Sequence, residues 1–510
     1  MSRRVAGDAD AVGTGKAGHV VVVGGGNAGL CAAISAREAG AGRVTVLEAA
    51  PEQLAGGNTA FTAGLMRVAF DGEADILALV PDLSPGDLAR TDFGSYTTTD
   101  FMNDLARVTE YRCDPDLADV LVTQSHPTLV WMREHGVRFA PAYGRQAFEV
   151  DGRFTFWGGV AFEVVGGGPG LVESLTSEAV RLGIDMRYST RALDLLSDDD
   201  GVAGVRARVD GEVVEIEAGA VVLAAGGFQA NAEWRTRYLG PGWDLAKVRG
   251  TRFNTGDGIR MALQIGASSA GNWSGCHAVG WDLNAPEFGD LAVGDGFQKH
   301  SYPFGILVNG EGRRFLDEGA DFRNFTYAKY GRVILQQPGQ FAWQVFDDKA
   351  TRLLRDEYRI REVTKVTANT LEELAARMDG VDPAGFLETV AAYNASVATE
   401  VPFDPNVLDG RRTNGISPPK SNWANPLDTP PYTAYAVTCG ITFTFGGLRI
   451  DTGTRVIDVD GRPIEGLFAC GELSAGIFFF NYPGGSGLTN GSVFGRIAGR
   501  NAVEAAVGVV

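Results

Sequence analysis

The sequence predicts an α/β fold in which a dinucleotide-binding domain, built from the N- and C-terminal parts of the chain, carries an inserted middle domain. Three observations predict it: a strand–glycine loop–helix–strand unit lies near the N-terminus, glycine clusters return near the C-terminus, and the composition changes in between. The chain of 510 residues is long enough for two domains. Its 69 glycines are clustered, which indicates a backbone that closely approaches a large ligand.

The N-terminal unit begins with a β-branched run over residues 19–23, which is typical of a buried parallel strand. The run leads into Gly24-x-Gly26-x-x-Gly29, and a helix and a second strand follow. These glycines permit a tight turn, a close approach of the backbone to a pyrophosphate, and close packing of the helix on the strand. Glu48 ends the second strand, where a carboxylate can accept hydrogen bonds from a ribose. This order predicts a dinucleotide site.

The middle domain is expected at residues 272–431, where aromatic residues, Asn and Pro become frequent and long β-branched runs thin out. Residues 19–271 and 432–510 would then form the dinucleotide-binding domain. Residues 1–18 lack the apolar segment of a signal peptide, and we expect them to form a mobile tail.

Charge and cysteine content exclude several classes of protein. Lys and Arg number 45 against 63 Asp and Glu, a net charge of −18, which opposes general binding to nucleic acid or to an anionic membrane. The five cysteines are isolated, so neither a disulfide framework nor a metal site is expected. No apolar run reaches the ~18 residues of a membrane span. We therefore expect a cytoplasmic protein with reduced thiols.

Three further segments resemble a known family. Residues 56–64 (GGNTAFTAG), 255–258 (TGDG) and 466–472 (GLFACGE) are similar to FAD-contacting segments of the fumarate reductase/succinate dehydrogenase flavoprotein superfamily. With the glycine loop they occur in the family's order, and the resemblance covers almost the whole chain from His19 to Arg500. It implies a Rossmann-like FAD-binding domain (GR2-type) with an inserted α+β capping domain, and a substrate held between cap and flavin.

The resemblance also assigns the cofactor contacts. The family's tethering histidine would fall within residues 58–63, where this chain has none, so non-covalent FAD is expected. The residues expected to contact FAD are Gly24, Gly26, Asn27, Ala28, Gly29, Glu48, Gly57, Asn58, Thr59, Gly64, Ala225, Gly226, Asp257, Glu472, Gly487, Leu488 and Thr489.

Within the superfamily, residues 313–332 are most similar to tricarballylate dehydrogenase. Fumarate reductases carry a related element whose arginine moves a proton at the substrate carbon. That arginine maps onto Arg323, with a Glu-to-Arg spacing one residue longer. Because the pKa of arginine in water lies above 12, the role needs desolvation and an acidic relay, for which Glu318 or Asp317 is the candidate. The alternative is that Arg323 only pairs with one of these acids or with Asp321.

Two departures from fumarate reductases concern the substrate carboxylates. The histidine that holds one carboxylate is absent from the matching stretch, residues 442–447, and Tyr482 stands where the arginine for the other would be. Succinate and fumarate are therefore not the expected substrates. Tyr482 with the glycines that follow it resembles the oxyanion arrangement of 3-ketosteroid dehydrogenases, in which a tyrosine hydroxyl and a backbone N–H polarise a ketone. The alternative is that Tyr482 only packs beside the flavin.

Four other residues are candidates for substrate binding: His277, His300, Tyr302 and Arg67. The histidines could bind a carboxylate or shuttle a proton, and Tyr302, like Tyr327, is a candidate acid–base group. Together with Arg323, Arg67 and the histidines could pair the three charges of a tricarboxylate. For His277, His300, Tyr302 and Tyr327, the alternative is a residue whose polar groups are satisfied within the core or a loop.

The favoured hypothesis is an FAD-dependent dehydrogenase, or desaturase, that oxidises a CH–CH bond α,β to a carboxylate or carbonyl. The resemblance favours tricarballylate as substrate and cis-aconitate as product, whereas Tyr482 favours a cyclic ketone or ketosteroid-type substrate. A non-catalytic flavin-binding electron-transfer subunit and an oxidase that uses oxygen are the alternatives. The expected partners are a small-molecule carboxylate or carbonyl substrate and an electron acceptor, such as a membrane electron-transfer protein or a quinone, and no nucleic acid.

Overall fold

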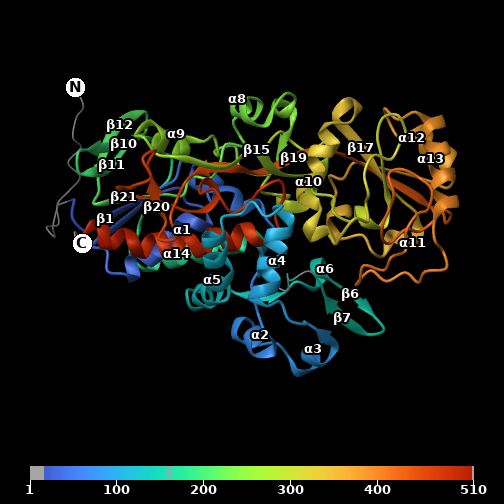
Figure 1. The fold of residues 1–510 in the computed structure, drawn as a ribbon, viewed down its shortest axis with the longest axis horizontal. Coiled ribbons are helices and arrows are strands. Elements are labelled where there is room, and N and C mark those ends of the chain that lie inside the picture. Colours follow the sequence, from blue (N-terminus) through green and yellow to red (C-terminus); the bar gives the residue numbers. More distant parts are fainter. Residues whose placement is uncertain (1–15, 158, 160–161, 508–510) are drawn as a thin grey trace.

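The computed structural model describes residues 16–157, 159 and 162–507. The tail predicted for residues 1–18 therefore lies almost wholly outside the described residues. Figure 1 shows an elongated molecule in which the two ends of the chain, blue and red, lie together at one end, and the yellow and orange middle segment occupies the other. The division into domains after residues 271 and 431 stays a prediction.

A six-stranded sheet forms one end of the molecule, in the spatial order β20-β21-β13-β1-β2-β9. Neighbouring strands are parallel except for the edge strand β20, which is antiparallel to β21. All residues of β1 are buried, because a central strand is covered on both faces. The predicted strand–loop–helix–strand unit is confirmed. The strands are β20 (Arg455–Ile457), β21 (Pro463–Ala469), β13 (Ala220–Leu223), β1 (His19–Val23), β2 (Arg43–Leu47) and β9 (Asp185–Arg187).

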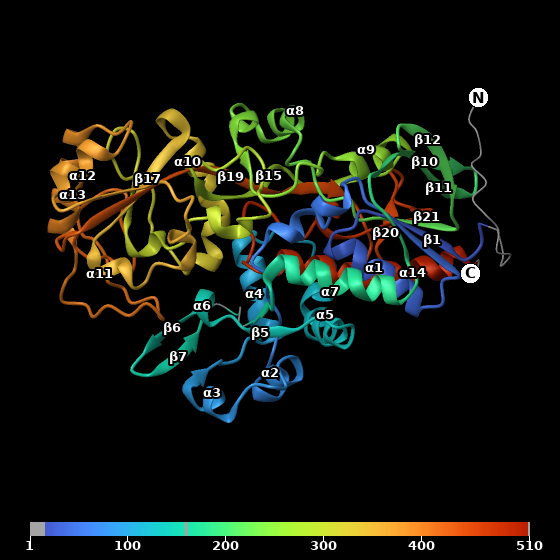
Figure 2. The ribbon, with the colours of Figure 1, turned by 180° about the vertical axis from the view of Figure 1, so that it is seen from behind.

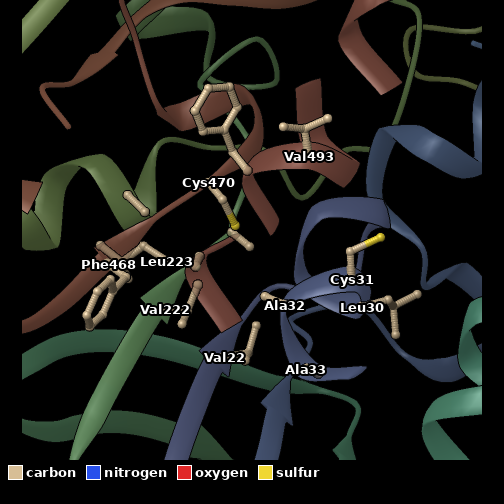
Figure 3. Close-up of a cluster of buried hydrophobic side chains, with 14 of the residues drawn as sticks. Val22, Leu30, Cys31, Ala32, Ala33, Val222, Leu223, Phe468, Cys470 and Val493 are labelled. Atoms are coloured by element: carbon tan, nitrogen blue, oxygen red, sulfur yellow. The ribbon is translucent and has the colours of Figure 1, made fainter. Parts of the chain in front are cut away.

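Two helices cover this sheet where the chain enters and leaves it. Helix α1 (Asn27–Glu38) follows the glycine loop and packs against the last helix, α14 (Ser486–Ala506). Figure 3 shows the core that they share with the sheet, to which Val22 of β1, Val222 of β13 and Val493 of α14 contribute. The N- and C-terminal parts of the chain therefore form one continuous core.

The helices α1 and α14 approach each other closely because α14 presents glycines to α1. A Cβ atom at Gly495 would lie 2.4 Å from the carbonyl oxygen of Ala28, and one at Gly499 would lie 2.0 Å from that of Ala32. Both distances are far below the contact distance of carbon and oxygen. The close packing fixes α14 relative to the glycine loop, and α14 begins at the cavity described below.

Strand β19 (Tyr432–Leu448), 17 residues long, organises a second sheet. It pairs with β14, β15, β17 and β18, and β16 pairs with β17. In both views β15 and β19 lie between the parallel sheet and the middle segment (Figures 1 and 2). The other strands are β14 (Lys247–Val248), β15 (Ser269–Asp282), β16 (Ile306–Val308), β17 (Phe341–Phe346) and β18 (Lys365–Ala368).

The helices of the middle segment cover this second sheet. Ile306, Trp343 and Phe386 belong to a buried apolar core that they share with it. This core is separate from the one between α1, α14 and the parallel sheet. The helices are α10 (Tyr327–Leu335), α11 (Asp348–Thr351), α12 (Leu371–Arg377) and α13 (Pro383–Ser396).

Smaller elements complete the fold. Strands β10, β11 and β12 form an antiparallel sheet, and short strands and helices between residues 65 and 164 form a lobe that Figure 2 shows below the second sheet. No helix of the described residues has the length and apolar character of a membrane span, and these residues contain no cluster of metal-ligating side chains. The remaining elements are β3 (Leu65–Met66), α2 (Glu73–Leu79), α3 (Pro85–Arg90), β4 (Thr91–Asp92), α4 (Thr98–Val108), α5 (Pro115–Glu134), β5 (Phe139–Pro141), α6 (Tyr143–Gln146), β6 (Ala147–Val150), β7 (Arg153–Phe156), β8 (Phe162–Val164), α7 (Gly167–Arg181), β10 (Thr190–Asp198), β11 (Gly201–Val209), β12 (Glu212–Glu217), α8 (Ala232–Trp234) and α9 (Asp257–Gln264).

The contact between α1 and α14 predicts that Gly499→Ala destabilises the protein. The new methyl group must push the helices apart, and overpacking of this kind costs about 1–3 kcal/mol even though alanine is the better helix former. The measurement is the free energy of unfolding in denaturant. Gly144→Ala is the matched control, because a Cβ atom at Gly144 meets nothing within 4 Å. Equal stability of the two variants would contradict the prediction.

Candidate cofactor and substrate site

One large cavity runs from the N-terminus of α1 to the aromatic residues around Tyr482. Its wall is built from segments far apart in the sequence: the glycine loop, the ends of β2 and β13, part of β19 and the start of α14. At the other end the wall includes His277, His300, Arg323 and Tyr327. Predicted cofactor residues and predicted substrate residues therefore line the same space.

The glycine loop is bare toward the cavity and closely packed behind it. At Gly24, where φ is +112°, a Cβ atom would lie 2.4 Å from the carbonyl oxygen of Ala224, and at Gly29 it would lie 1.9 Å from that of Gly24. At Gly26, by contrast, the nearest atom is 3.6 Å away, and the residue lines the cavity. A pyrophosphate cradle at a helix N-terminus requires this combination.

Glu48 lines the cavity next to this loop. One carboxylate oxygen accepts a hydrogen bond from the backbone N–H of Gly25 and the other from that of Ala50, both at 2.8 Å. Burial is the largest influence on the carboxyl group and raises its pKa, and the backbone N–H groups act in the opposite direction. The backbone therefore fixes the orientation of the carboxylate, and acceptor sites remain for a ribose hydroxyl.

Glu472 is the second carboxylic acid at the cofactor end of the cavity. It accepts hydrogen bonds from the backbone N–H of Thr444, at 2.9 Å, and from the side-chain amide of Gln229, at 3.2 Å. Burial raises the pKa of Glu472 to about 7. Near neutral pH this group therefore exchanges between an acid that donates a hydrogen bond and a carboxylate that only accepts.

Most residues that the resemblance assigned to the cofactor lie in the cavity wall. They come from the glycine loop, β2, the segment after it, β13, α9, the turn after β21, and α14. The residues of this set that line the cavity are Gly24, Gly26, Asn27, Ala28, Glu48, Gly57, Asn58, Thr59, Ala225, Gly226, Asp257, Glu472, Gly487 and Leu488.

Gly29, Gly64 and Thr489 lie behind the wall, so we correct their role from contact to support. Gly29 permits the close packing described above, and a Cβ atom at Gly64 would lie 2.8 Å from the carbonyl carbon of Gly167. The hydroxyl of Thr489 donates to the carbonyl oxygen of Arg67 at 2.7 Å. These residues shape the backbone around the cavity without facing it.

Aromatic side chains form the substrate end of the cavity. The hydroxyls of Tyr327 and Tyr482 are hydrogen-bonded to each other; Tyr482 is buried and Tyr327 is half-buried. The ring of His277 lies 4.9 Å from that of Tyr327 and 4.7 Å from that of Tyr482. Phe443 packs edge-on against both His277 and Tyr482. These rings contact one another and form an apolar wall against which a flat group can pack.

The two histidines in this wall carry no charge at neutral pH. Burial lowers the pKa of His277 and of His300 well below the usual value, and neighbouring guanidinium groups lower it further. Among the described residues, neither ring nitrogen of His277 has a hydrogen-bond partner, and Nε2 of His300 has none. Their predicted placement at the substrate is supported, whereas a role as fixed positive anchors is not.

Guanidinium groups and carboxylates lie at the substrate end of the cavity, where Arg145, Arg249, Arg323 and Asp295 line it, and directly behind these residues. Nε of Arg249 donates to Asp295 at 3.0 Å, and Arg145 lies 3.5 Å from the same carboxylate. Glu163 is close enough to Arg145 to interact with it electrostatically, as Arg355 is to Arg323. We refer to these groups as the charged cluster, and its members are Arg145, Arg249, Arg323, Arg355, Asp295, Glu357 and Glu163.

Arg323 lies in the cavity wall as predicted, but the acid beside it is not Glu318. Arg323 Nη1 lies 4.0 Å from Glu357 Oε1, and burial lowers the pKa of Arg323. The carboxylate of Glu318 instead accepts from Nε of Arg314 at 3.0 Å and from the backbone N–H of Leu307 at 2.9 Å. The structure therefore does not support the relay predicted through Glu318, because this carboxylate is held in a buried ion pair with Arg314.

Tyr302 and Arg67 do not line the cavity, so their predicted contacts with substrate are also corrected. The hydroxyl of Tyr302 is bonded to Thr326 at 2.5 Å within an apolar core. Arg67 is fully buried behind the glycines that follow Tyr482, and its Nε donates to the carbonyl oxygen of Gly484 at 2.8 Å. A residue type capable of binding substrate is not evidence that the residue faces it.

Sequence reasoning missed the charged cluster apart from Arg323. Arg145 precedes the hairpin of β6 and β7, Arg249 follows β14, and Asp295 lies in a short turn of the middle segment. These residues are more than 45 positions apart in the chain and belong to no motif. A possible signal is arginine next to glycine at Arg249-Gly250, but it is too common to single out a site.

Comparison with known proteins identifies the family to which this site belongs. A family described as FAD binding domain matches residues 19–488. The chain is 31% identical over 506 residues to a probable fumarate reductase, Ifc3, from Shewanella frigidimarina, which covers 98% of this chain and 76% of that protein. It is 32% identical over 373 residues to 4-oxocyclohex-2-ene-1-carboxylate 5-dehydrogenase from Sinomonas cyclohexanicum, covering 66% of this chain and 60% of that protein.

A solved structure gives the same picture. The crystal structure of 3-ketosteroid-Δ4-(5α)-dehydrogenase from Rhodococcus jostii RHA1, in complex with 4-androstene-3,17-dione, is similar with a TM-score of 0.67 and 26% identity. The match covers 95% of this chain and 96% of that one. The cofactor is FAD, and the glycine cradle with its flanking Glu48 fits the pyrophosphate and ribose of this dinucleotide.

We expect the FAD to be held without a covalent bond, so acid precipitation should leave the yellow chromophore in the supernatant.

Glu48→Ala should weaken FAD binding at least about tenfold, because a charged hydrogen-bond acceptor for the ribose is lost. The measurement is FAD titration of the apoprotein. Glu52→Ala, at an exposed acid nearby, is the control. Flavin that stays with the precipitate would contradict the first expectation, and equal affinities the second.

Proposed function

Because the chain belongs to the FAD binding domain family of the fumarate reductase/succinate dehydrogenase superfamily and is an FAD-dependent oxidoreductase acting on CH–CH groups, we propose that it dehydrogenates a carbonyl compound carrying one carboxylate. The bond oxidised is the CH–CH bond next to the carbonyl, and a cyclic keto acid is the proposed type of substrate. One observation carries this proposal: a single excess positive charge lies beside the hydrogen-bonded pair of tyrosines.

The charge count follows from the charged cluster. Its four guanidinium groups meet three carboxylates, which leaves one positive charge at neutral pH. Burial lowers the pKa of Arg355 to about 9, which still leaves this group charged. The nearby histidines are neutral, so they add nothing to the count. Since a buried charge must be paired, the pocket is complementary to a substrate with one carboxylate.

The tyrosine pair favours a substrate that carries a carbonyl group. The hydroxyl of one tyrosine donates to the other, so the second retains a proton that it can donate to a substrate oxygen. Burial raises the pKa of both Tyr327 and Tyr482, so both remain protonated donors at neutral pH. Such donors stabilise an enolate more than the ketone from which it forms, because negative charge develops on the oxygen only as the α-proton leaves.

The proposed chemistry divides between the cofactor and the protein. When bound, FAD supplies the acceptor for the β-hydride, which no side chain can supply. Tyr482 holds the carbonyl oxygen, and Arg323 takes the α-proton after its own proton has moved to Glu357, which leaves the total charge of the cluster unchanged. Burial makes the neutral guanidine more accessible than it is in water. The aromatic walls exclude water and hold the ring of the substrate.

The compounds named for two relatives have the two features of the proposed substrate, a ketone and a carboxylate. The name of the Sinomonas protein combines a ring ketone with one carboxylate, and the Rhodococcus structure holds a steroid ketone. The tricarballylate that the sequence favoured would bring three negative charges to a pocket with one excess positive charge. Charge pairing therefore favours the keto acid over the tricarboxylate.

The test is anaerobic reduction of the flavin by a panel of saturated compounds. The loss of visible absorbance of the flavin measures the rate of reduction. The panel is 4-oxocyclohexane carboxylate, cyclohexanone, succinate and tricarballylate. The proposal expects the keto acid to reduce the flavin fastest and cyclohexanone to bind more weakly. Fastest reduction by tricarballylate would restore the tricarboxylate hypothesis. Reduction by none of them would leave open a non-catalytic electron-transfer role and overturn the proposed substrate.

We predict that Arg323→Lys lowers kcat by about 10²-fold or more while FAD content stays unchanged. Lysine keeps the positive charge but loses the planar geometry and position of the guanidinium, and general acid–base roles contribute about 10²–10⁴-fold. Arg313→Lys is the control, because Arg313 is exposed in the same segment and pairs with Glu388. A decrease of less than about fivefold would transfer the proton-transfer role to Tyr327.

We predict that Tyr482→Phe lowers kcat by about 10²–10³-fold and changes KM little, because the lost hydrogen bond is made mainly in the transition state. Tyr393→Phe is the control, since Tyr393 is equally buried but does not line the cavity. Steady-state kinetics with the substrate found in the panel measure the effect. A change confined to KM would show that Tyr482 only binds the substrate in its ground state.

A further inference from the structure

Arg67 lies directly behind the glycines that follow Tyr482. Its side chain is fully buried, and its guanidinium faces the rings of Tyr96 and Phe325, each with its centre 5.1 Å away. Nη1 donates to the hydroxyl of Tyr96 at 2.7 Å, and that hydroxyl donates to Asp104 at 2.9 Å. The positive charge is thus held at one point in an apolar setting.

Arg67 binds two successive peptide groups of the cavity wall, one through its side chain and one through its backbone. Its Nε donates to the carbonyl oxygen of Gly484 at 2.8 Å, and its backbone N–H donates to the carbonyl oxygen of Gly485 at 3.2 Å. At Gly485, where φ is +86°, a Cβ atom would lie 3.0 Å from the backbone nitrogen of Arg67. Glycine is required there both for the backbone conformation and for the close approach.

The planarity of the peptide bond determines where the opposite side of this group points. In a trans peptide the N–H and C=O groups point in opposite directions. The carbonyl of Gly484 points away from the cavity toward Arg67, which does not line it, so the N–H of Gly485 points toward the cavity. Tyr482, Gly484 and Gly485 all line the cavity. The N–H of Gly485 therefore lies on the side where a substrate carbonyl would meet Tyr482.

We propose that Arg67 is a positioning residue that polarises the Gly484–Gly485 peptide, so that the N–H of Gly485 and the hydroxyl of Tyr482 together stabilise an enolate oxygen. This inference rests on the proposed function: the resemblance to 3-ketosteroid dehydrogenases already implies a backbone donor beside the tyrosine, and the role of Arg67 behind that donor is the new element. A cation bound to a carbonyl oxygen draws electrons toward it and makes the N–H of the same peptide a stronger donor.

Other contacts support this arrangement. The N–H of Gly484 donates to the carbonyl oxygen of Asn324 at 2.8 Å, so the turn is held from the middle segment as well. Both the backbone N–H of Gly485 and the charge of Arg67 lower the pKa of Tyr482, against the larger effect of burial. Both groups therefore lie close to the oxygen of Tyr482, which the larger effect of burial keeps protonated.

The test compares binding of an anion with binding of a neutral molecule of similar shape. The probes are p-nitrophenolate, whose oxygen carries negative charge as an enolate does, and p-nitroanisole, which cannot ionise. Calorimetric titration of the FAD-loaded protein measures both affinities. Arg67→Met should weaken p-nitrophenolate binding about tenfold and change p-nitroanisole binding less than about twofold, because charge-assisted hydrogen bonds are roughly twice as strong as neutral ones.

Arg235→Met is the matched control. Arg235 is also buried and donates only to backbone carbonyl oxygens, among them those of Trp243, at 2.8 Å, and Asp244, at 2.9 Å. Its loss removes a buried arginine of the same kind without touching the turn after Tyr482. If Arg67→Met does not retain FAD, Arg67→Gln takes its place, because glutamine removes the charge while keeping a hydrogen-bond donor, and the same selective loss is expected.

Selective loss of phenolate affinity in the Arg67 variant, with the control unchanged, supports the proposal. Equal weakening of both probes, or weakening of neither, overturns it, because a purely structural role would not distinguish the anion from the neutral molecule. The measurement needs no turnover. If no member of the substrate panel reduces the flavin, the proposed function fails while the phenolate measurement still decides the role of Arg67.

Discussion

The pairing of β19 with β15 is the interaction on which the rest of the site depends, because these strands connect the parallel sheet with the middle segment. One end of β19 pairs with β17 and β18, and its other end forms cavity wall at residues 442–445. At Gly447 a Cβ atom would lie 2.1 Å from the carbonyl oxygen of Leu473, so the strand passes very close to the turn that carries Glu472. One strand therefore sets the distance between the cofactor end and the substrate end of the cavity.

Burial of ionisable groups then determines what this space can bind. Histidines in the wall are neutral, because burial and the neighbouring guanidinium groups both lower their pKa. Guanidinium groups stay charged when buried, and here they are held by Asp295 and Glu357, which leaves a small positive excess. Specificity thus arises from the difference between buried charges of opposite sign rather than from the number of basic residues. From the sequence alone, Arg67, Arg323, His277 and His300 were expected to pair the three charges of a tricarboxylate.

The sequence predicted the cofactor half of the molecule far better than the substrate half. Glu48 and the glycine loop are close in sequence and have fixed roles in a strand–loop–helix–strand unit, so spacing alone placed them correctly. The substrate half depends on contacts between distant segments, such as Arg145 with Asp295. There, spacing misled: Glu318 lies five residues before Arg323 yet binds Arg314, because the chain between them turns before it enters the cavity. When the spacing between two residues of a motif has changed, the motif no longer predicts which residues meet in the folded loop.

Arg67 was predicted to contact the substrate, but it lies behind Gly484 and can act on the cavity only indirectly. Facing the cavity, it would bind a substrate carboxylate directly and add a second uncompensated charge. Behind Gly484 its charge is partly balanced by Asp104, 3.9 Å away, so it reaches the cavity only through a peptide group. A peptide dipole is strengthened by the cation without bringing a full charge to the substrate. Such a donor favours an oxygen on which charge develops during the reaction over one that is charged from the start. The position of Arg67 therefore suits a ketone, whose oxygen becomes charged only during the reaction. A tricarboxylate is charged from the start and would require the arginine to face the cavity.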